Sequence, residues 1–144
     1  MNQESITRAG QIVAANTVKN AVYKGEVCNL SLIDEDGYPT TSVLTPAASE
    51  GIKWLTLCTS LDGNAVRRIK KCNRASISFT SSEYCVNLVG EVEIITNADV
   101  KREMWYDGLI NHYTSADDPN YCVLKFTTKR YKLFVDWKDA EGTL

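Results

Sequence analysis

Apolar and polar residues alternate along several short segments of this 144-residue chain, and this period of two constrains its fold most. Successive side chains of a β-strand point to opposite faces, so such alternation predicts strands with one buried face. The acidic run at 34–36, followed by Gly37, predicts a tight turn because glycine tolerates a positive φ. Six strands are expected, at residues 26–33, 40–45, 52–59, 75–82, 84–96 and 121–137.

Three other segments space their apolar residues for one face of a helix. Helices are expected at residues 4–19, 61–72 and 98–110. In the middle one, Asp62 is placed to serve as the N-cap, because a carboxylate accepts hydrogen bonds from first-turn amides. The sequence shows no repeat, linker or composition shift, so residues 1–144 are expected to form a single domain.

The order of these segments favours a curled sheet. Consecutive strands joined by tight turns pair antiparallel, and six strands in a small domain protect their edges by closing into a barrel. Pro46 is expected to end the strand at 40–45, because proline cannot donate to a ladder. Gly90 predicts a bulge or tight bend within 84–96. The expected fold class is mainly β, a β-barrel with flanking helices.

Charge and hydropathy exclude two classes of partner. The formal net charge is −2 at pH 7, whereas a nucleic-acid or anionic-membrane binder needs a basic surface to neutralise phosphates. No stretch approaches the roughly 18 apolar residues of a membrane-spanning helix. Residues 1–22 lack the basic start and continuous apolar run of a secretory signal. We therefore expect a cytoplasmic protein with no nucleic-acid and no membrane partner.

The cysteines argue against a metal site. There are five of them, at wide spacings and without a CxxC pair, and His112 is the single histidine. Zinc sites need ligands at close, regular spacing, so we expect no bound metal and free thiols in a reducing compartment. His112 lies in a polar loop without an evident partner, and we expect it at the surface rather than in acid–base catalysis.

The segment 58–71 carries the strongest chemical signal. Thr59 and Ser60 end a predicted strand just before a predicted helix begins, and the cations Arg67 and Arg68 follow on that helix. Hydroxyls, cations and the backbone N–H groups of a helix N-terminus are the donors that bind a phosphate. The same pattern also fits a capped helix with a solvated basic face, so both interpretations stay open.

Four segments, at residues 36–46, 54–75, 87–95 and 118–137, together resemble one known family. Their order and spacing are similar to those of the FMN-binding split-barrel proteins of the pyridoxamine 5'-phosphate oxidase-like family, in particular the general stress protein 26 group. The resemblance implies a six-stranded antiparallel split β-barrel of the FMN-binding type. It also implies a homodimer that holds FMN in a groove between its two subunits.

The resemblance further implies where the cofactor lies. Residues 42–45 would run along the flavin ring, and the segment 58–65 would hold the phosphate. Trp105 would cover the flavin or a dimer seam, with plain core packing as the alternative. The implied cofactor-binding residues are Ser42, Val43, Leu44, Thr45, Cys58, Thr59, Ser60, Asn64, Ala65, Arg67, Arg68 and Trp105.

This chain departs from the family's pattern at three of these positions. Ser42, Asn64 and Ala65 stand where the family has cations. The positive charge near the phosphate would then come from Arg67 or Arg68, with neutral hydrogen bonds supplying the rest. A neutral hydrogen bond is roughly half as strong as a charge-assisted one.

The function that the resemblance implies is an FMN-dependent oxidoreductase. Flavin would carry two-electron transfer between a reduced nucleotide and a small acceptor, and the substrate is unknown. The alternative is a non-catalytic protein that binds or senses flavin, haem or another planar ligand on the same barrel. A third interpretation is an interaction module without a ligand. No residue is identified as catalytic.

Overall fold

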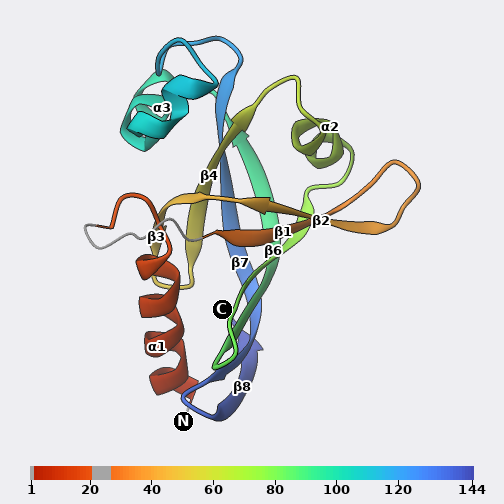
Figure 1. Cartoon of the computed structure of the whole chain (residues 1–144). Coiled ribbons are helices and arrows are strands. Elements are labelled where there is room, and N and C mark those ends of the chain that lie inside the picture. Colours follow the sequence, from red (N-terminus) through yellow and green to blue (C-terminus); the bar gives the residue numbers. More distant parts are fainter. Residues whose placement is uncertain (1, 21–26) are drawn as a thin grey trace.

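One antiparallel sheet forms the body of the protein in the computed structural model, which describes residues 2–20 and 27–144 (Figure 1). The strand order is β2-β1-β5-β6-β7-β4-β3, and β8 pairs with β7 outside this path. The sheet is strongly curled, so the expected mainly β, antiparallel barrel class is confirmed. The strands are β1 (Cys28–Ile33), β2 (Pro39–Leu44), β3 (Pro46–Glu50), β4 (Trp54–Ser60), β5 (Arg74–Thr80), β6 (Cys85–Ile95), β7 (Tyr121–Val135) and β8 (Lys138–Thr143).

Strand β7 organises this sheet because it is paired along both edges. One edge takes the whole of β6. The other edge takes β4 along its first half, from Tyr121 to Thr127, and β8 along its second half, from Arg130 to Val135. The sheet therefore divides at β7 into two lobes that diverge from a shared strand.

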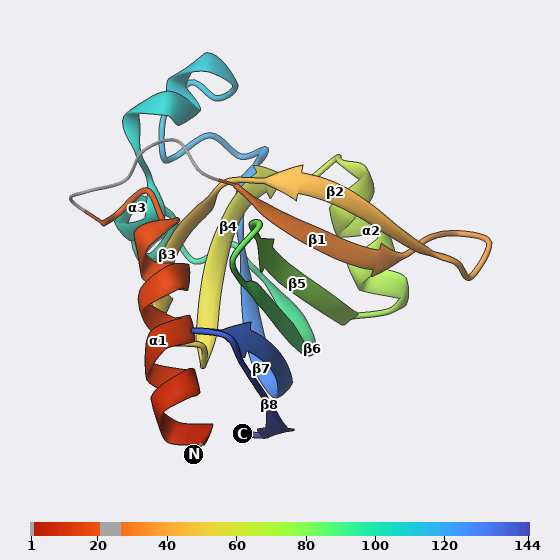
Figure 2. The same ribbon diagram turned by 60° about the horizontal axis from the view of Figure 1, so that its bottom comes forward.

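Helices lie on the outside of this sheet. The first packs on β3, β7 and β8, the second on β1 and β6, and the third on β7 (Figure 2). Each turns its apolar side inward, as Ile12 and Val13 do on the first helix. None of them, in the part of the chain described, is long and apolar enough to cross a membrane. They are α1 (Asn2–Ala15), α2 (Asn64–Lys71) and α3 (Ala98–Met104), and a short 3₁₀ helix, η1 (Asp107–Asn111), follows α3.

The described residues form two strands more than the six expected. Pro46 begins β3 instead of only ending β2, because the first residue of an edge strand need not donate to a ladder. Strand β8 follows a two-residue turn in which Asp136 and Trp137 have φ values of 51° and 63°. That conformation is typical of Asn-Gly or Asp-Gly, so an Asp-Trp pair gave no turn signal in the sequence.

Several boundaries also differ from expectation. The helix expected at 98–110 is two elements, because Trp105 has an extended backbone (φ −62°, ψ 140°) between α3 and η1. The first helix ends at Ala15 rather than at residue 19. The strand expected at 26–33 begins at Cys28, and Glu26 lies outside the described residues.

The apolar interior consists of two clusters on opposite faces of the sheet. Strand β7 serves both, because Leu124 and Phe126 belong to the main core whereas Tyr121 and Val123 face a second cluster. The second cluster lies under α3 and η1 and is built on Ala47, Met104, Leu109, Tyr113, Tyr121 and Val123.

Gly90 allows β6 and β7 to approach closely. The register between these strands shifts between Val89 and Gly90, and the extra residue, Lys129, lies on β7, so the irregularity predicted at Gly90 falls on the facing strand. A Cβ atom at position 90 would lie only 2.0 Å from the Thr127 carbonyl oxygen. Because that atom belongs to the backbone, no rotamer change relieves the contact.

We therefore expect Gly90→Ala to lower the free energy of unfolding by about 3 kcal/mol, as overpacking against backbone does. Gly108→Ala is the matched control, since its Cβ would meet the Tyr106 ring at an ordinary 3.5 Å. Urea denaturation of both variants measures the difference. Equal stability of the two variants would show that β6 and β7 can move apart at position 90 without a loss of folding free energy.

Candidate functional site

A cavity of about 210 Å³ lies between α2 and the β1–β2 hairpin, and we call it the α2 pocket. It receives side chains from two neighbouring strands, the end of β4 and the first turns of α2. Of the described residues that line it, only Arg68 is charged. The lining residues are Leu30, Leu32, Thr40, Ser42, Leu44, Thr59, Asn64, Ala65 and Arg68.

A larger hollow of about 430 Å³ lies between α1 and the β7–β8 turn, but its charges satisfy one another. Arg8 pairs with Asp136 at 3.5 Å, and Lys138 pairs with Glu4 at 3.8 Å. The α2 pocket is the smaller site, yet it gathers hydroxyl, amide and guanidinium groups around apolar walls. That combination is typical of a ligand site.

Strand periodicity builds the walls of the α2 pocket. Leu30 and Leu32 are two residues apart on β1 and nearly inaccessible to solvent, so they provide an apolar floor. Thr40 and Ser42 follow the same period on β2, so both line the pocket. The intervening Thr41 points the other way and bonds the Ser31 hydroxyl at 2.9 Å.

Helix α2 begins at the pocket without a side-chain cap. Its N-cap is Gly63, not Asp62 as the sequence predicted. Asp62 instead pairs with Asn120, which exchanges two hydrogen bonds of 3.2 Å with it. Because glycine has no side chain, the N-cap offers no acceptor to the first-turn amides. The first turn of α2, whose residues Asn64 and Ala65 line the pocket, therefore keeps N–H groups without a side-chain acceptor at the positive end of the helix dipole.

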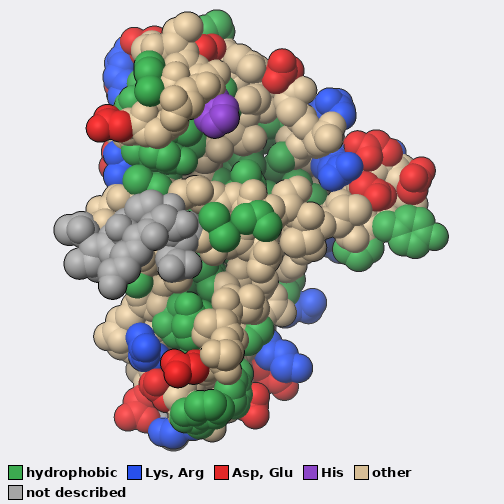
Figure 3. All heavy atoms as spheres, in the orientation of Figure 1, with side chains coloured by type: hydrophobic (Ala, Val, Ile, Leu, Met, Phe, Trp, Pro, Cys, Tyr) green, Lys and Arg blue, Asp and Glu red, His purple; other side chains and the backbone are tan. Residues whose placement is uncertain are grey.

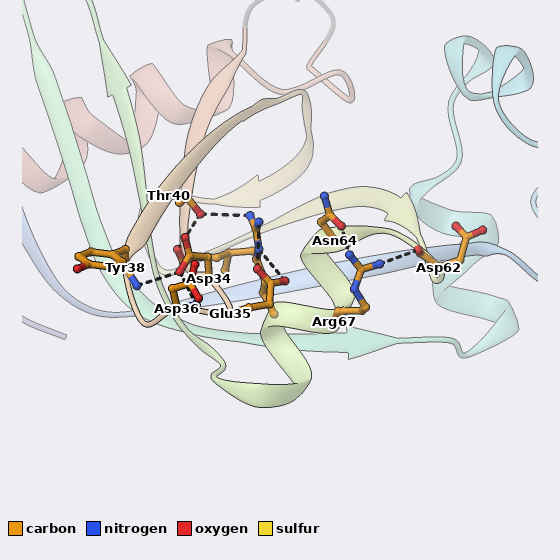
Figure 4. A network of polar contacts seen from close by, with 10 residues as sticks. Asp34, Glu35, Asp36, Tyr38, Thr40, Asp62, Asn64 and Arg67 are labelled. Carbon is orange, nitrogen blue, oxygen red and sulfur yellow. Dashed lines mark hydrogen bonds and ion pairs between the residues drawn. The ribbon is translucent and has the colours of Figure 1, made fainter.

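Arg67 orients Asn64 at the start of α2 (Figure 4). Its guanidinium donates to the Asn64 Oδ1 atom and, at 3.5 Å, to the Asp62 carbonyl. Since the Asn64 oxygen is occupied, the free hydrogen-bonding group of that side chain is its Nδ2 donor. In Figure 4 this nitrogen points away from Arg67.

Arg68 is held at the pocket by the β1–β2 hairpin. Its Nε lies 3.4 Å from Glu35 Oε1, its Nη2 lies 3.5 Å from Glu35 Oε2, and its Nη1 lies 3.2 Å from Thr40 Oγ1. A backbone N–H, and then Arg68 itself, lower the pKa of Glu35. Glu35 is therefore ionised at neutral pH and forms an ion pair with Arg68.

The structure brings together half of the cofactor-binding residues implied by the sequence. Residues of β2, of the end of β4 and of α2 meet at one cavity although up to 26 positions separate them in the chain. No other described residue engages the Thr59 hydroxyl, which is free to donate. The implied residues in the α2 pocket are Ser42, Leu44, Thr59, Asn64, Ala65 and Arg68.

Three of the implied residues lie on the opposite face of the sheet, in the second cluster. Cys58 and Ser60 flank Thr59 on β4, so strand alternation directs them away from the α2 pocket. The Cys58 sulfur lies 3.6 Å from the Tyr121 hydroxyl, and Ser60 Oγ lies 2.6 Å from the Tyr113 hydroxyl. Trp105 packs edge-on against Tyr121, at 5.4 Å between ring centres.

The other three implied residues surround the α2 pocket without lining it. Val43 is 60% exposed on β2, where it alternates with Ser42 and Leu44. Thr45 lies between β2 and β3. Arg67 acts on the pocket through Asn64.

Sequence reasoning missed Leu30, Leu32, Thr40 and Glu35. The signal was present in the hairpin itself. An antiparallel turn at 34–37 places Leu32 opposite Thr40 and Leu30 opposite Ser42, which the observed register has. If the two strands are paired across the predicted turn, Ser42 on one strand identifies Leu30 on the other as a neighbouring residue of the same wall.

The thiols of Cys28, Cys58 and Cys122 are poor nucleophiles in this fold. All five cysteines are free. Burial raises the pKa of Cys58 to about 11, and it raises the pKa of Cys28 to about 12 and that of Cys122 to about 11. Thiolate chemistry requires the opposite shift, so Cys58 contributes packing and a weak hydrogen bond rather than catalysis.

We expect iodoacetamide at pH 7.5 to alkylate the exposed Cys85 first and Cys58 at least about tenfold more slowly, because only the thiolate reacts. The Cys58 rate should rise as the pH approaches 11, where its raised pKa permits ionisation. Peptide mass mapping after timed quenching gives both rates. The urea-unfolded protein is the control, and equal rates in the folded protein would refute the assignment.

A family model described as pyridoxamine 5'-phosphate oxidase matches residues 16–134 of this chain. That range includes every residue that lines the α2 pocket. A comparison with curated protein sequences found no match.

Several solved structures share the fold. A protein related to general stress protein 26, of the pyridoxinephosphate oxidase family of Clostridium acetobutylicum, is 22% identical with a TM-score of 0.82, covering 100% of this chain and 97% of that one. General stress protein 26 of Bacillus anthracis is 17% identical with a TM-score of 0.76, covering 99% and 98%. A haem-binding protein of Mycobacterium smegmatis is 21% identical with a TM-score of 0.72, covering 96% and 57%. At these identities the similarity establishes the fold alone.

Proposed function

Because this chain belongs to the pyridoxamine 5'-phosphate oxidase family, we propose that it is a flavoprotein whose α2 pocket holds the phosphate end of FMN. The observation that carries this proposal is the convergence of unlike donors on one cavity. Thr59 offers a hydroxyl, Asn64 an amide and Arg68 a guanidinium, next to a helix N-terminus. A phosphate accepts hydrogen bonds from all of these groups.

The residues present fit a phosphate at one end of the pocket, and the other wall is apolar. Leu30, Leu32 and Leu44 line the remaining wall, so the pocket offers no charge that would repel a phosphate except through Glu35. The role of this chain's own residues is to bind and orient the cofactor. The bound flavin would supply two-electron transfer between a reduced nucleotide and a small acceptor.

We propose that the ring end of the cofactor lies along β2 and is covered by a second copy of the chain. The α2 pocket, at about 210 Å³, is smaller than the roughly 300–1,000 Å³ of most cofactor sites, so one subunit encloses only part of FMN. Strand β2 is an edge of the sheet, and Val43 on it is 60% exposed. An exposed edge with apolar side chains is a surface that association protects.

Haem is the second candidate ligand, because a haem-binding protein shares the fold and Arg68 could pair with a propionate. Iron in haem proteins is held by His, Cys, Met or Tyr. None of the described residues that line the α2 pocket is of these types. The donor set therefore favours FMN over haem.

We expect Arg68→Ala to weaken FMN binding about 10- to 100-fold, because it removes a charge-assisted hydrogen bond to the phosphate. Lys71→Ala is the matched control, since it removes a positive charge from the same helix outside the pocket. Quenching of flavin fluorescence on titration measures both affinities. Equal losses of FMN affinity in the two variants would mean that FMN binding depends on the total charge of α2 and not on a contact with Arg68.

The proposal itself is tested by the visible absorption spectrum of the purified protein after addition of FMN and desalting. Retained flavin bands support it. If the protein does not retain FMN but binds haemin with a shifted Soret band, haem rather than flavin would be its ligand. A protein that retains neither ligand would leave the α2 pocket without the proposed cofactor.

We expect sedimentation equilibrium to give about twice the 16.1 kDa chain mass. Val43→Glu should shift the equilibrium toward the monomer, because it places a charge on the proposed covered face of β2. Ile110→Glu is the control, since Ile110 is equally exposed (59%) but lies on η1. A monomeric wild-type protein would contradict the shared cofactor groove.

A further inference from the structure

We infer that Glu35 is a specificity-determining residue, which competes with the ligand for Arg68 and so limits the preference of the α2 pocket for a phosphate-bearing ligand. This inference rests on the proposed function, in which the phosphate end of FMN lies at Arg68. It concerns a residue outside the pocket lining, on the tip of the β1–β2 hairpin. Its basis is that Arg68, the one cation among the described residues that line the pocket, already forms hydrogen bonds with the hairpin.

Most donors of Arg68 are occupied before any ligand arrives. A guanidinium has five N–H groups in a fixed planar fork. Two of them bind the Glu35 carboxylate and a third binds Thr40, which leaves one N–H on each terminal nitrogen. While Glu35 keeps its hydrogen bonds, Arg68 can donate at most two hydrogen bonds to a phosphate. Further donors become available only if Glu35 leaves.

Thr40 limits how far Arg68 can move. Its hydroxyl accepts from Arg68 at 3.2 Å and donates to the Leu32 carbonyl at 3.3 Å. The one O–H donor of Thr40 is therefore engaged by the Leu32 carbonyl and is not available to a ligand. The Arg68 side chain is only 21% exposed, so it is fixed against the hairpin rather than swinging in solvent.

The acidic tip of the hairpin places negative charge close to the position proposed for the phosphate of the ligand. Asp34 is used within the turn, where it accepts from the backbone N–H groups of Asp36 and Tyr38. Glu35 faces Arg68 instead. Figure 3 shows acidic side chains gathered on the protruding hairpin, with basic side chains next to them. A phosphate bound to Arg68 would thus lie close to the ionised Glu35 carboxylate and be repelled by it.

An uncharged ligand does not meet this repulsion. Riboflavin carries the same ring and ribityl chain as FMN but no phosphate, so Glu35 has no charge to oppose. The Glu35–Arg68 pair should therefore lower the affinity for FMN and leave that for riboflavin unchanged. The ratio of the two affinities is the quantity that Glu35 controls.

Glu35→Gln tests this inference, with Asp36→Asn as the matched control. Both substitutions remove one negative charge from the same hairpin tip, but only Glu35 contacts Arg68. We expect Glu35→Gln to tighten FMN binding about three- to tenfold, in line with a partly exposed ion pair, and to change riboflavin binding less than about twofold. Asp36→Asn should change neither affinity by more than about twofold.

Arg68→Ala completes the cycle. In an Arg68→Ala background, Glu35→Gln should tighten FMN binding less than it does in the wild-type protein, because the competition for Arg68 is gone and only the direct repulsion between Glu35 and the phosphate remains. Tighter FMN binding by Glu35→Gln alone supports the inference, even if the wild-type protein binds FMN too weakly to measure. An equal gain for riboflavin, for Asp36→Asn or in the Arg68→Ala background overturns it.

Failure of the proposed function has a different result. In that case neither the wild-type protein nor Glu35→Gln binds FMN at any concentration, and both proposals fall together. If the wild-type protein binds FMN and Glu35→Gln binds it equally well, only the inference on Glu35 falls. Thermal melting of each variant, expected to stay near that of the wild-type protein, confirms that a loss of fold does not cause the result.

Discussion

Pairing along both edges of β7 is the constraint on which the rest of the structure depends. This strand joins β6 on one side and both β4 and β8 on the other, so it connects the two lobes of the sheet. Its alternating side chains enter both apolar clusters. Gly90 makes this possible, because a side chain at that position would collide with the β7 backbone. The end of β4 that reaches the α2 pocket is positioned by the same pairing.

The α2 pocket shows how one strand serves two purposes. At the end of β4, Thr59 faces the cavity while Cys58 and Ser60 face the second cluster. Burial raises the pKa of Cys58, whereas the hydroxyl of Thr59 stays available to a ligand. The pleat of the sheet thus directs the side chains that pack in the apolar cluster to one face of β4 and the hydroxyl available to a ligand to the other face.

Most of the architecture could be predicted from period and turn residues, and the family resemblance implied six of the nine described residues that line the candidate site. The alternation of residues 75–82 and the turn at 34–37 are local signals, and the corresponding elements formed. Strand β8 was missed because an Asp-Trp turn with positive φ has no local signal. The Glu35–Arg68 contact was missed for another reason, since it joins residues 33 positions apart through tertiary structure.

The position of β7 in the chain also bears on how the protein is made. Its residues, 121–135, leave the ribosome after those of β4 and β6, the strands that it joins. Until then the facing edges of β4 and β6 have no partner, and the apolar side chains that β7 covers are open to other chains. The nascent chain is therefore most vulnerable to aggregation just before its longest strand emerges, and chaperones that shield unpaired edges would act on it at that stage.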